Sequence, residues 1–225
     1  MRMSLFTIRP AWLGGTLWLL IGVTAALAPV AQAQSVSGRA YGAFVQSPLG
    51  TQQSAVAVLP AVTADDGAMA DDAADAMSVP GTLTTEALTG TTSGGIGDAA
   101  AAQSVATVFN VNLLNGLITA SSLTATVSST SDGAQATSNA LGSTLADLVV
   151  NGVPLTSGDG SIAPNTRMTL PGVGYVVLNE QLSSGDGVRT SGLTVNLIHV
   201  VLQNALTGIQ TGEIIVGSAS SNAAM

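Results

Sequence analysis

The chain has no cysteine, no lysine and a single histidine, His199, among its 225 residues. Without cysteine it cannot form disulfides, bind zinc through thiolates or use a thiol nucleophile. Without lysine it lacks the phosphate-binding residue of a P-loop and the amine of a Schiff base. One imidazole cannot supply a metal site built mainly from histidine. These absences exclude several common classes of catalytic and metal site.

Charge and aromatic rings are also scarce. Thirteen acidic residues face only five arginines, which gives a formal net charge of −8 with His199 neutral. No basic cluster occurs after residue 33, so we expect no nucleic-acid partner. Only four aromatic residues follow that position: Tyr41, Phe44, Phe109 and Tyr175.

Residues 1–33 are typical of a Sec-type secretory signal peptide. Arg2 and Arg9 form a positive region, an apolar run covers residues 11–28, and Ala31 and Ala33 supply the small residues of a cleavage site. An uncleaved membrane anchor is the alternative. We expect cleavage before Gln34 and a secreted, extracellular or cell-surface location. No later apolar run reaches membrane-spanning length, so no transmembrane segment is expected after cleavage.

Short runs of β-branched and small residues, separated by turn residues, indicate an all-β fold. Alternation is clear where Leu123, Ala125 and Val127 interleave with Thr124 and Thr126. About ten such runs predict one antiparallel β-sandwich or jelly-roll-like domain over residues 34–219. The sequence Ser-Gly-Asp-Gly occurs at 157–160 and 184–187, but its neighbours do not repeat. Because no fixed period is found, a β-helix or solenoid is kept only as the alternative.

Two segments are expected to lie outside the strands. Residues 63–79 contain five aspartates, which disfavour a helix and predict a solvated acidic loop. Residues 220–225 are expected to form a short tail without an anchor.

Three Asp-Gly pairs are candidate ligands for Ca²⁺, the one cofactor that the sequence suggests. Asp132, Asp159 and Asp186 each precede a glycine, and Ca²⁺ prefers carboxylate and carbonyl oxygens from flexible loops. The alternative is that each pair simply forms a turn, because aspartate bonds its own backbone and glycine accepts positive φ.

His199 lies in an apolar run, and such a histidine is usually a packed residue that is hydrogen-bonded to a neighbour. No G-x-S-x-G motif marks a serine nucleophile, so we expect no enzymatic activity. Glu180 follows an apolar run and is expected to pair with Arg167 or Arg189, or else to be exposed for binding.

Several short motifs occur along the chain in a recognisable order. Asn151-Gly152 is a hairpin signal and Pro171-Gly172 suits a type II turn. Asn179 and Glu180 lie in the run 177–181, and His199 lies in the run 195–200. With residues 37–42, 148–154 and 215–219, this order resembles the bacterial choice-of-anchor P family. The resemblance implies an exported, β-rich surface domain and brings no catalytic residues.

These features predict a non-enzymatic secreted or cell-surface structural protein. Its partners would be other copies of itself, or components of the cell envelope or extracellular matrix. The alternative is a Ca²⁺-assisted module that binds carbohydrate or mediates adhesion. A third hypothesis is a secreted hydrolase that uses His199.

Overall fold

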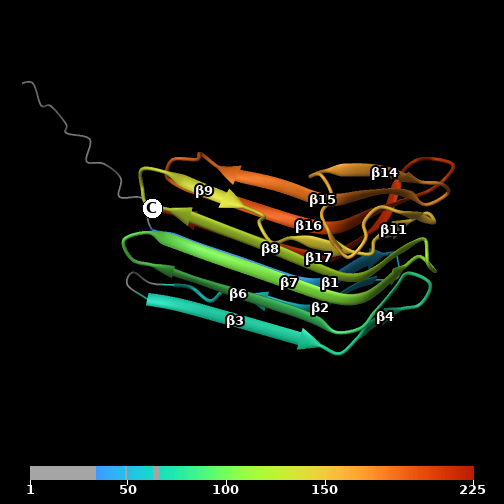
Figure 1. The fold of residues 1–225 in the computed structure, drawn as a ribbon, viewed down its shortest axis with the longest axis horizontal. Helices are drawn as coiled ribbons and strands as arrows, with labels where there is room; N and C mark the ends of the chain where they lie inside the picture. The colour runs from blue at the N-terminus through green and yellow to red at the C-terminus, as the bar shows by residue number, and fades with distance from the viewer. Residues whose placement is uncertain (1–33, 49, 63–65) are drawn as a thin grey trace, which may run out of the picture. The chain divides into compact units, whose positions relative to one another are not determined.

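The computed structural model describes residues 34–48, 50–62 and 66–225, and there it is an antiparallel β-sandwich (Figure 1). The predicted all-β class is confirmed, and the solenoid alternative is not supported. The expected signal peptide, residues 1–33, lies outside the described residues. Among the residues described, no helix is long and apolar enough to cross a membrane.

One sheet, here called sheet A, contains six strands. Their spatial order is β14 (Thr166–Leu170), β15 (Gly174–Gly185), β16 (Thr190–Gln203), β17 (Gln210–Ala224), β1 (Ser35–Ser47) and β2 (Gly50–Val58). The last strand therefore lies between the first strand and β16, so both ends of the domain are held in the centre of one sheet.

The other sheet, sheet B, is built around two long strands, β7 (Ala100–Leu113) and β8 (Ile118–Ser131). On the β7 side lie β6 (Leu88–Ile96) with β3 (Asp66–Ala74), and β5 (Leu83–Thr85) with β4 (Met77–Val79). On the β8 side lie β9 (Ala136–Asn139), β10 (Thr144–Ala146) with β13 (Asp159–Gly160), and β11 (Val149–Val150) with β12 (Val153–Pro154).

Two boundary predictions were wrong. The segment 63–79 is not a loop where it is described, because β3 pairs with β6 along its whole length and β4 pairs with β5. Among the described strands, β3 pairs only with β6, and aspartate is tolerated at such an edge because it faces solvent. Residues 220–225 are not a separate tail, because β17 continues to Ala224 beside β1 and β16.

The local turn predictions were correct. Asn151 and Gly152 join β11 to β12 with φ of 52° and 75°, as a hairpin turn of the primed type requires. After Leu170, Gly172 has φ of 73° and the amide of Val173 donates to the carbonyl of Leu170 at 3.0 Å.

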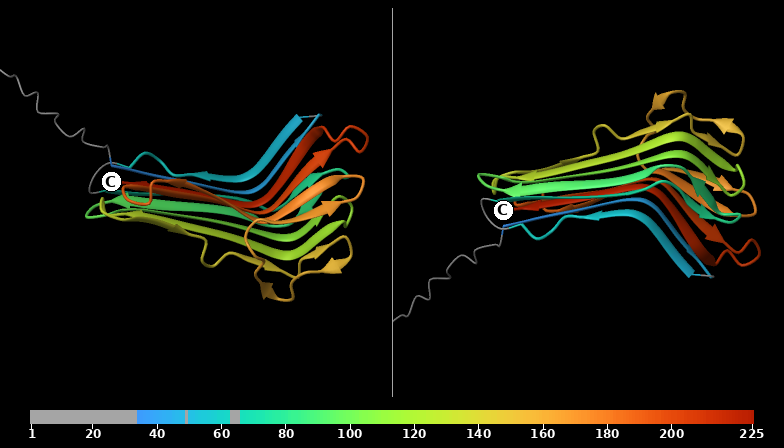
Figure 2. Two further views of the ribbon diagram at one scale, coloured as in Figure 1. Left: turned by 90° about the horizontal axis from the view of Figure 1, so that it is seen from above. Right: turned by 90° about the horizontal axis from the view of Figure 1, so that it is seen from below.

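The strands of both sheets bend together part-way along their length (Figure 2). Ala55, Asn179 and Gly217 in sheet A, and Asn110 in sheet B, are skipped in the pairing register and have φ between 48° and 68°. In β7 and β8, successive buried side chains lie three positions apart instead of two, at Val108 and Val111 and at Ala120 and Leu123. In β1 and β16 two adjacent residues are buried instead, Gly42 with Ala43 and Leu197 with Ile198. In each of these strands, the alternation of inward-facing and outward-facing residues therefore shifts by one position at the bend.

Small residues bring the sheets close together on one side of this bend. A Cβ atom on Gly90 would lie 2.7 Å from the carbonyl oxygen of Ala55 on the facing sheet. Hydroxyl pairs fill part of the interior there, with Thr92 and Ser104 joined at 2.9 Å between their oxygens. Ser129 and Ser221 join the two sheets at 2.7 Å. Large aliphatic side chains, such as Leu123 and Leu197, fill the core at the bend.

Candidate functional site

The candidate site is a row of polar side chains on the outer face of sheet A, beside the bend. The register places Glu180, Asn196, Ser218 and Tyr41 opposite one another on four neighbouring strands. Asn196 Nδ2 donates to Glu180 Oε2 at 2.7 Å, and Ser218 Oγ donates to Asn196 Oδ1 at 2.7 Å. Burial raises the pKa of Tyr41, although a hydrogen bond with Ser218 opposes this effect.

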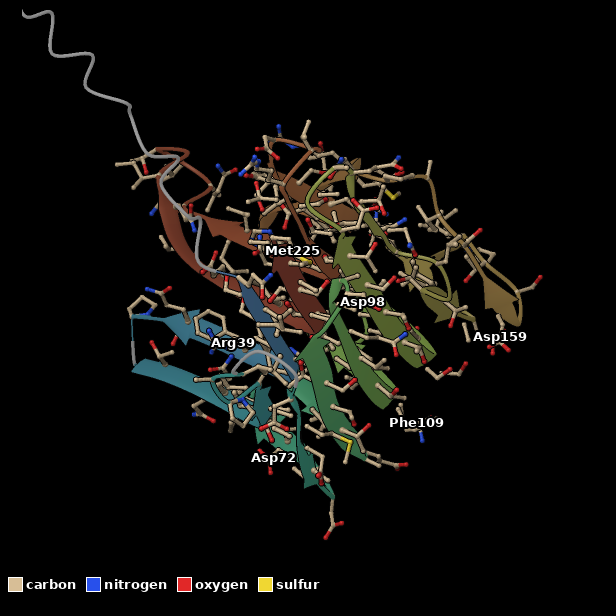
Figure 3. The ribbon with its side chains drawn as sticks, turned by 90° about the vertical axis from the view of Figure 1, so that its left-hand side faces the viewer. Arg39, Asp72, Asp98, Phe109, Asp159 and Met225 are labelled. Carbon is tan, nitrogen blue, oxygen red and sulfur yellow. The ribbon has the colours of Figure 1, made fainter. Side chains whose placement is uncertain are left out.

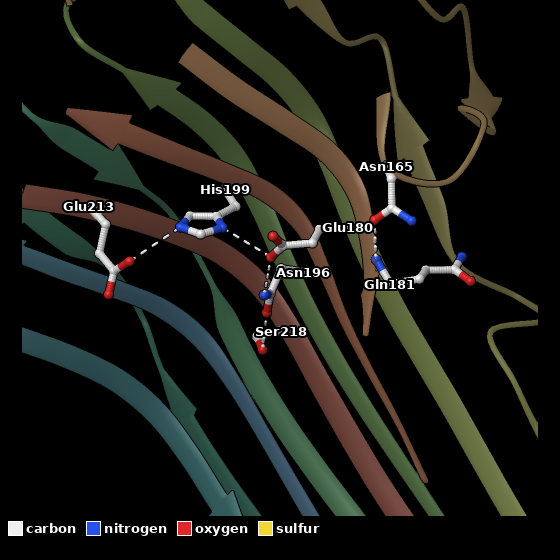
Figure 4. Close-up of polar contacts among 7 residues, drawn as sticks. All are labelled: Asn165, Glu180, Gln181, Asn196, His199, Glu213 and Ser218. Atoms are coloured by element: carbon white, nitrogen blue, oxygen red, sulfur yellow. Dashed lines mark hydrogen bonds and ion pairs between the residues drawn. The ribbon is translucent and has the colours of Figure 1, made fainter. Parts of the chain in front are cut away.

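His199 connects this row to a second carboxylate (Figure 4). Its Nδ1 lies 2.9 Å from Glu180 Oε2, and its Nε2 lies 3.2 Å from Glu213 Oε2. The side chains of His199, Glu180 and Glu213 are only 16%, 17% and 26% exposed. We call these three residues with Asn196 and Ser218 the histidine cluster.

The geometry of the histidine cluster indicates the charged form of the ring. An ionised carboxylate only accepts hydrogen bonds, and a neutral imidazole carries a single N–H. Both ring nitrogens contact carboxylate oxygens, so only the doubly protonated ring satisfies both contacts. The hydrogen bond to Glu180 raises the pKa of His199 against the opposing effect of burial. The same bond lowers the pKa of Glu180.

Aromatic rings and arginines surround the histidine cluster on the same face. The rings of Tyr41 and Phe44 meet edge to face with centroids 6.5 Å apart, and Arg39 Cζ lies 5.4 Å from the centroid of Tyr41. Arg167 Cζ lies 3.7 Å from the centroid of Tyr175. We call these five residues and the histidine cluster face A. Three of the four described aromatic residues and two of the three described arginines belong to it.

Face A contains only part of what the sequence indicated. His199 is packed and hydrogen-bonded, as expected. The expected pairing of Glu180 with Arg167 or Arg189 was wrong, because Glu180 bonds to His199 and Asn196 while Arg167 stacks on Tyr175. Arg167 lies two strands from His199 in the register, and β15 separates them.

Glu213 and Tyr41 were not singled out from the sequence. Each lies in a strand with no local motif, and only the pairing of β17 with β1 and β16 brings them to the face. In the sequence, Tyr41 follows Arg39 and Ala40, and Glu213 precedes the apolar run 214–216, so nothing local relates either residue to His199.

The three candidate Ca²⁺ ligands are not brought into one site. Asp132 Oδ1 accepts from the amides of Ala134 and Gln135 at 2.9 and 2.7 Å. Asp186 Oδ1 accepts from three amides of its own turn, at 2.8–2.9 Å, and these bonds lower its pKa to about 2. Both aspartates therefore form turns.

Asp159 lies in the short strand β13, opposite Ala146. Within residues 34–48, 50–62 and 66–225, no group of three or more His, Asp or Glu side chains is arranged to hold a metal ion. Ca²⁺ binding stays a prediction.

Comparison of the chain with protein-family models, with curated protein sequences and with solved structures finds no match.

Proposed function

We propose that this chain is an exported, non-enzymatic interaction protein that associates through face A. The observation that carries the proposal is the gathering of Tyr41, Phe44, Tyr175, Arg39 and Arg167 on one outer sheet face. Aromatic residues and arginine are the types most enriched at the energetic centres of protein interfaces. A chain with four aromatic residues after position 33 places three of them there.

A second copy of the chain is the partner that the charges of face A favour. Arg39 and Arg167 flank Glu180 and Glu213, so the face carries both signs of charge. In a two-fold symmetric pair the same patch meets itself, and arginines of one copy can then face carboxylates of the other. Components of the cell envelope or matrix are the other partners consistent with an exported surface domain.

The chemistry of His199 supports a binding role over a catalytic one. Both ring nitrogens are engaged by carboxylates, and among the described residues no hydroxyl group contacts the ring. A general base needs a free nitrogen within reach of a nucleophile's proton.

Size-exclusion chromatography with light scattering on residues 34–225 tests the proposal. The described residues from 34 onward form one compact unit, so this chain is suitable. We expect a concentration-dependent dimer that Phe44→Ser weakens at least tenfold.

Phe109→Ser is the matched control, because Phe109 is an exposed ring on sheet B (Figure 3). A chain that stays monomeric at high concentration and binds no envelope fraction would contradict the proposal. Equal weakening by both substitutions would contradict the assignment to face A.

A carbohydrate ligand is the second candidate for face A. Sugars pack on aromatic rings and donate hydroxyl hydrogen bonds to carboxylates. In the register Tyr175 and Glu213 both lie opposite Val201, and Phe44 lies opposite Ile215 on the strand of Glu213. Glycan-array binding that Phe44→Ser abolishes would favour this alternative. Thermal melts in 2 mM Ca²⁺ and in EDTA test its Ca²⁺-assisted form, which unchanged melting would exclude.

A further inference from the structure

The two halves of the edge strand β2 differ in whether their outer edge is hydrogen-bonded to sheet B. Near its end, the amide of Val56 donates to Asp72 Oδ2 of β3 at 2.8 Å, which ties this half to the edge of sheet B. The first half, Gly50 to Gln53, is exposed and carries no charge. Native proteins usually block such an edge with charge, proline or a covering segment, because its free N–H and C=O groups can pair with another chain.

A cleft of about 610 Å³ lies beside the open half. Its volume falls within the range of roughly 300–1,000 Å³ that is typical of ligand sites. Val45 of β1 and Gln52 of β2 are opposite one another in the register and line one wall. Val79, Pro80 and Thr82, around the turn after β4, line the other. In Figure 2 the β1–β2 arm diverges from the strands of sheet B at this end.

We propose that this cleft binds an extended polypeptide segment of a partner, which adds to β2 as a further strand of sheet A. The main chain of the segment would pair with the free edge of Gly50–Gln53. Alternate side chains of an added strand point to the same side. Those on the inner side would enter the cleft and contact Val45, Val79 and Pro80, so they would be small and apolar.

The acidic residues Asp72 and Asp75 favour a basic residue at one end of the partner segment. Asp72 bonds to Val56, three residues beyond the open half of β2. The chain then runs through Asp75 into β4, whose Val79 lines the cleft. A basic residue on the partner, placed next to the apolar positions, would therefore meet carboxylates as it leaves the cleft.

The same charges argue against a second copy of β2 as the occupant. The strand Gly50–Val58 contains no basic residue that could face Asp72 or Asp75. The site lies on the inner side of sheet A and is independent of face A.

The probe is a synthetic peptide of alternating threonine and valine that ends in arginine, with a second version that ends in glutamate. Amide hydrogen exchange on residues 34–225 is measured with each. With the arginine peptide we expect exchange at residues 50–54 to slow at least tenfold, while exchange at Asp66–Ala74 stays unchanged. The glutamate version is expected to bind several-fold more weakly.

Two matched substitutions locate the site. Gln52→Lys places a charge toward the cleft and is expected to weaken peptide binding at least tenfold. Gln53→Lys makes the same change on the opposite face of the same strand and is expected to leave binding unchanged. Both side chains are exposed, so both variants should fold.

Three results would overturn the proposal: no slowing at millimolar peptide, equal effects of the two substitutions, or dimerisation of the free Phe44→Ser chain that protects residues 50–54. None of these results depends on face A, so the two proposals can fail separately.

Discussion

Asp72 of β3 accepts a hydrogen bond at 2.8 Å from the backbone amide of Val56 of β2, and so joins an edge of sheet B to an edge of sheet A. Its other oxygen accepts from the amide of Ala73 at 3.0 Å. A single side chain thus occupies an edge donor that would otherwise be open to another strand.

Removing this carboxylate should expose the second half of β2. We expect Asp72→Ala to speed hydrogen exchange at Val56 at least tenfold and to lower the concentration at which the chain aggregates. Asp71→Ala is the control, because it removes the neighbouring charge without removing this bond. Faster exchange at Val56 in both variants would attribute the effect to charge alone.

The stability of the domain should fall as pH rises past neutrality. The folded-state pKa of His199 is raised above its ordinary value of 6.5, mainly by its hydrogen bond to Glu180. The protonated ring therefore stabilises the fold fully below about pH 6.5, and this contribution is lost as pH rises through the higher folded pKa. Urea unfolding at pH 6 and pH 8.5 should show the loss.

Glu180 should make the domain less stable at low pH. Its pKa is lowered from 4.5, so its contribution is present above that pH and is lost as pH falls through the lower folded value. His199→Gln should remove the decline above pH 6.5. An NMR titration that places the pKa of His199 below 6.5 would contradict the imidazolium assignment.

The two carboxylates around His199 should not be equivalent. Glu180 bonds to both Asn196 and His199 and is the less exposed of the two, whereas the closest contact of Glu213 is longer. We expect Glu180→Gln to lower the free energy of unfolding by about 1–3 kcal/mol, because it disturbs two charge-assisted bonds. Glu213→Gln should cost about 1 kcal/mol or less. The reverse order in denaturant unfolding would show that Glu213 is the main partner.

The bend should depend on the residues with positive φ on neighbouring strands of the two sheets. Gly217 has φ of 68° and lies against Leu197. Gly217→Ala should destabilise the domain by roughly 1–2 kcal/mol, since an L residue is strained in that region. Gly97→Ala, at a position with open space and no positive φ, should change stability by less than about 0.5 kcal/mol. Similar unfolding midpoints for the two variants would show that the bend does not rely on Gly217.

The parts of the fold that were predictable are local. A turn forms where Asn151-Gly152 or Pro171-Gly172 supplies the required φ angles, and these residues are adjacent in the chain. Asp132 and Asp186 likewise bond to amides within four residues of themselves. The acidic segment was misread because its aspartates suit an edge strand, and a strand becomes an edge only through the order of the sheet.

The bend and the histidine cluster were beyond prediction because they depend on register between distant strands. Tyr41 and Ser218 are neighbours only because β17 returns to pair with β1. Strict alternation of residues, which the sequence pattern assumes, fails at the bend, and this shift determines which side chains reach face A.

By itself, the sequence determined an all-β chain with turns at defined positions, because β propensity and turn chemistry act between close neighbours. The tertiary structure alone decided that His199 lies between Glu180 and Glu213. Carboxylates on two different strands can share one imidazole only after the pairing of β15, β16 and β17 has set their register.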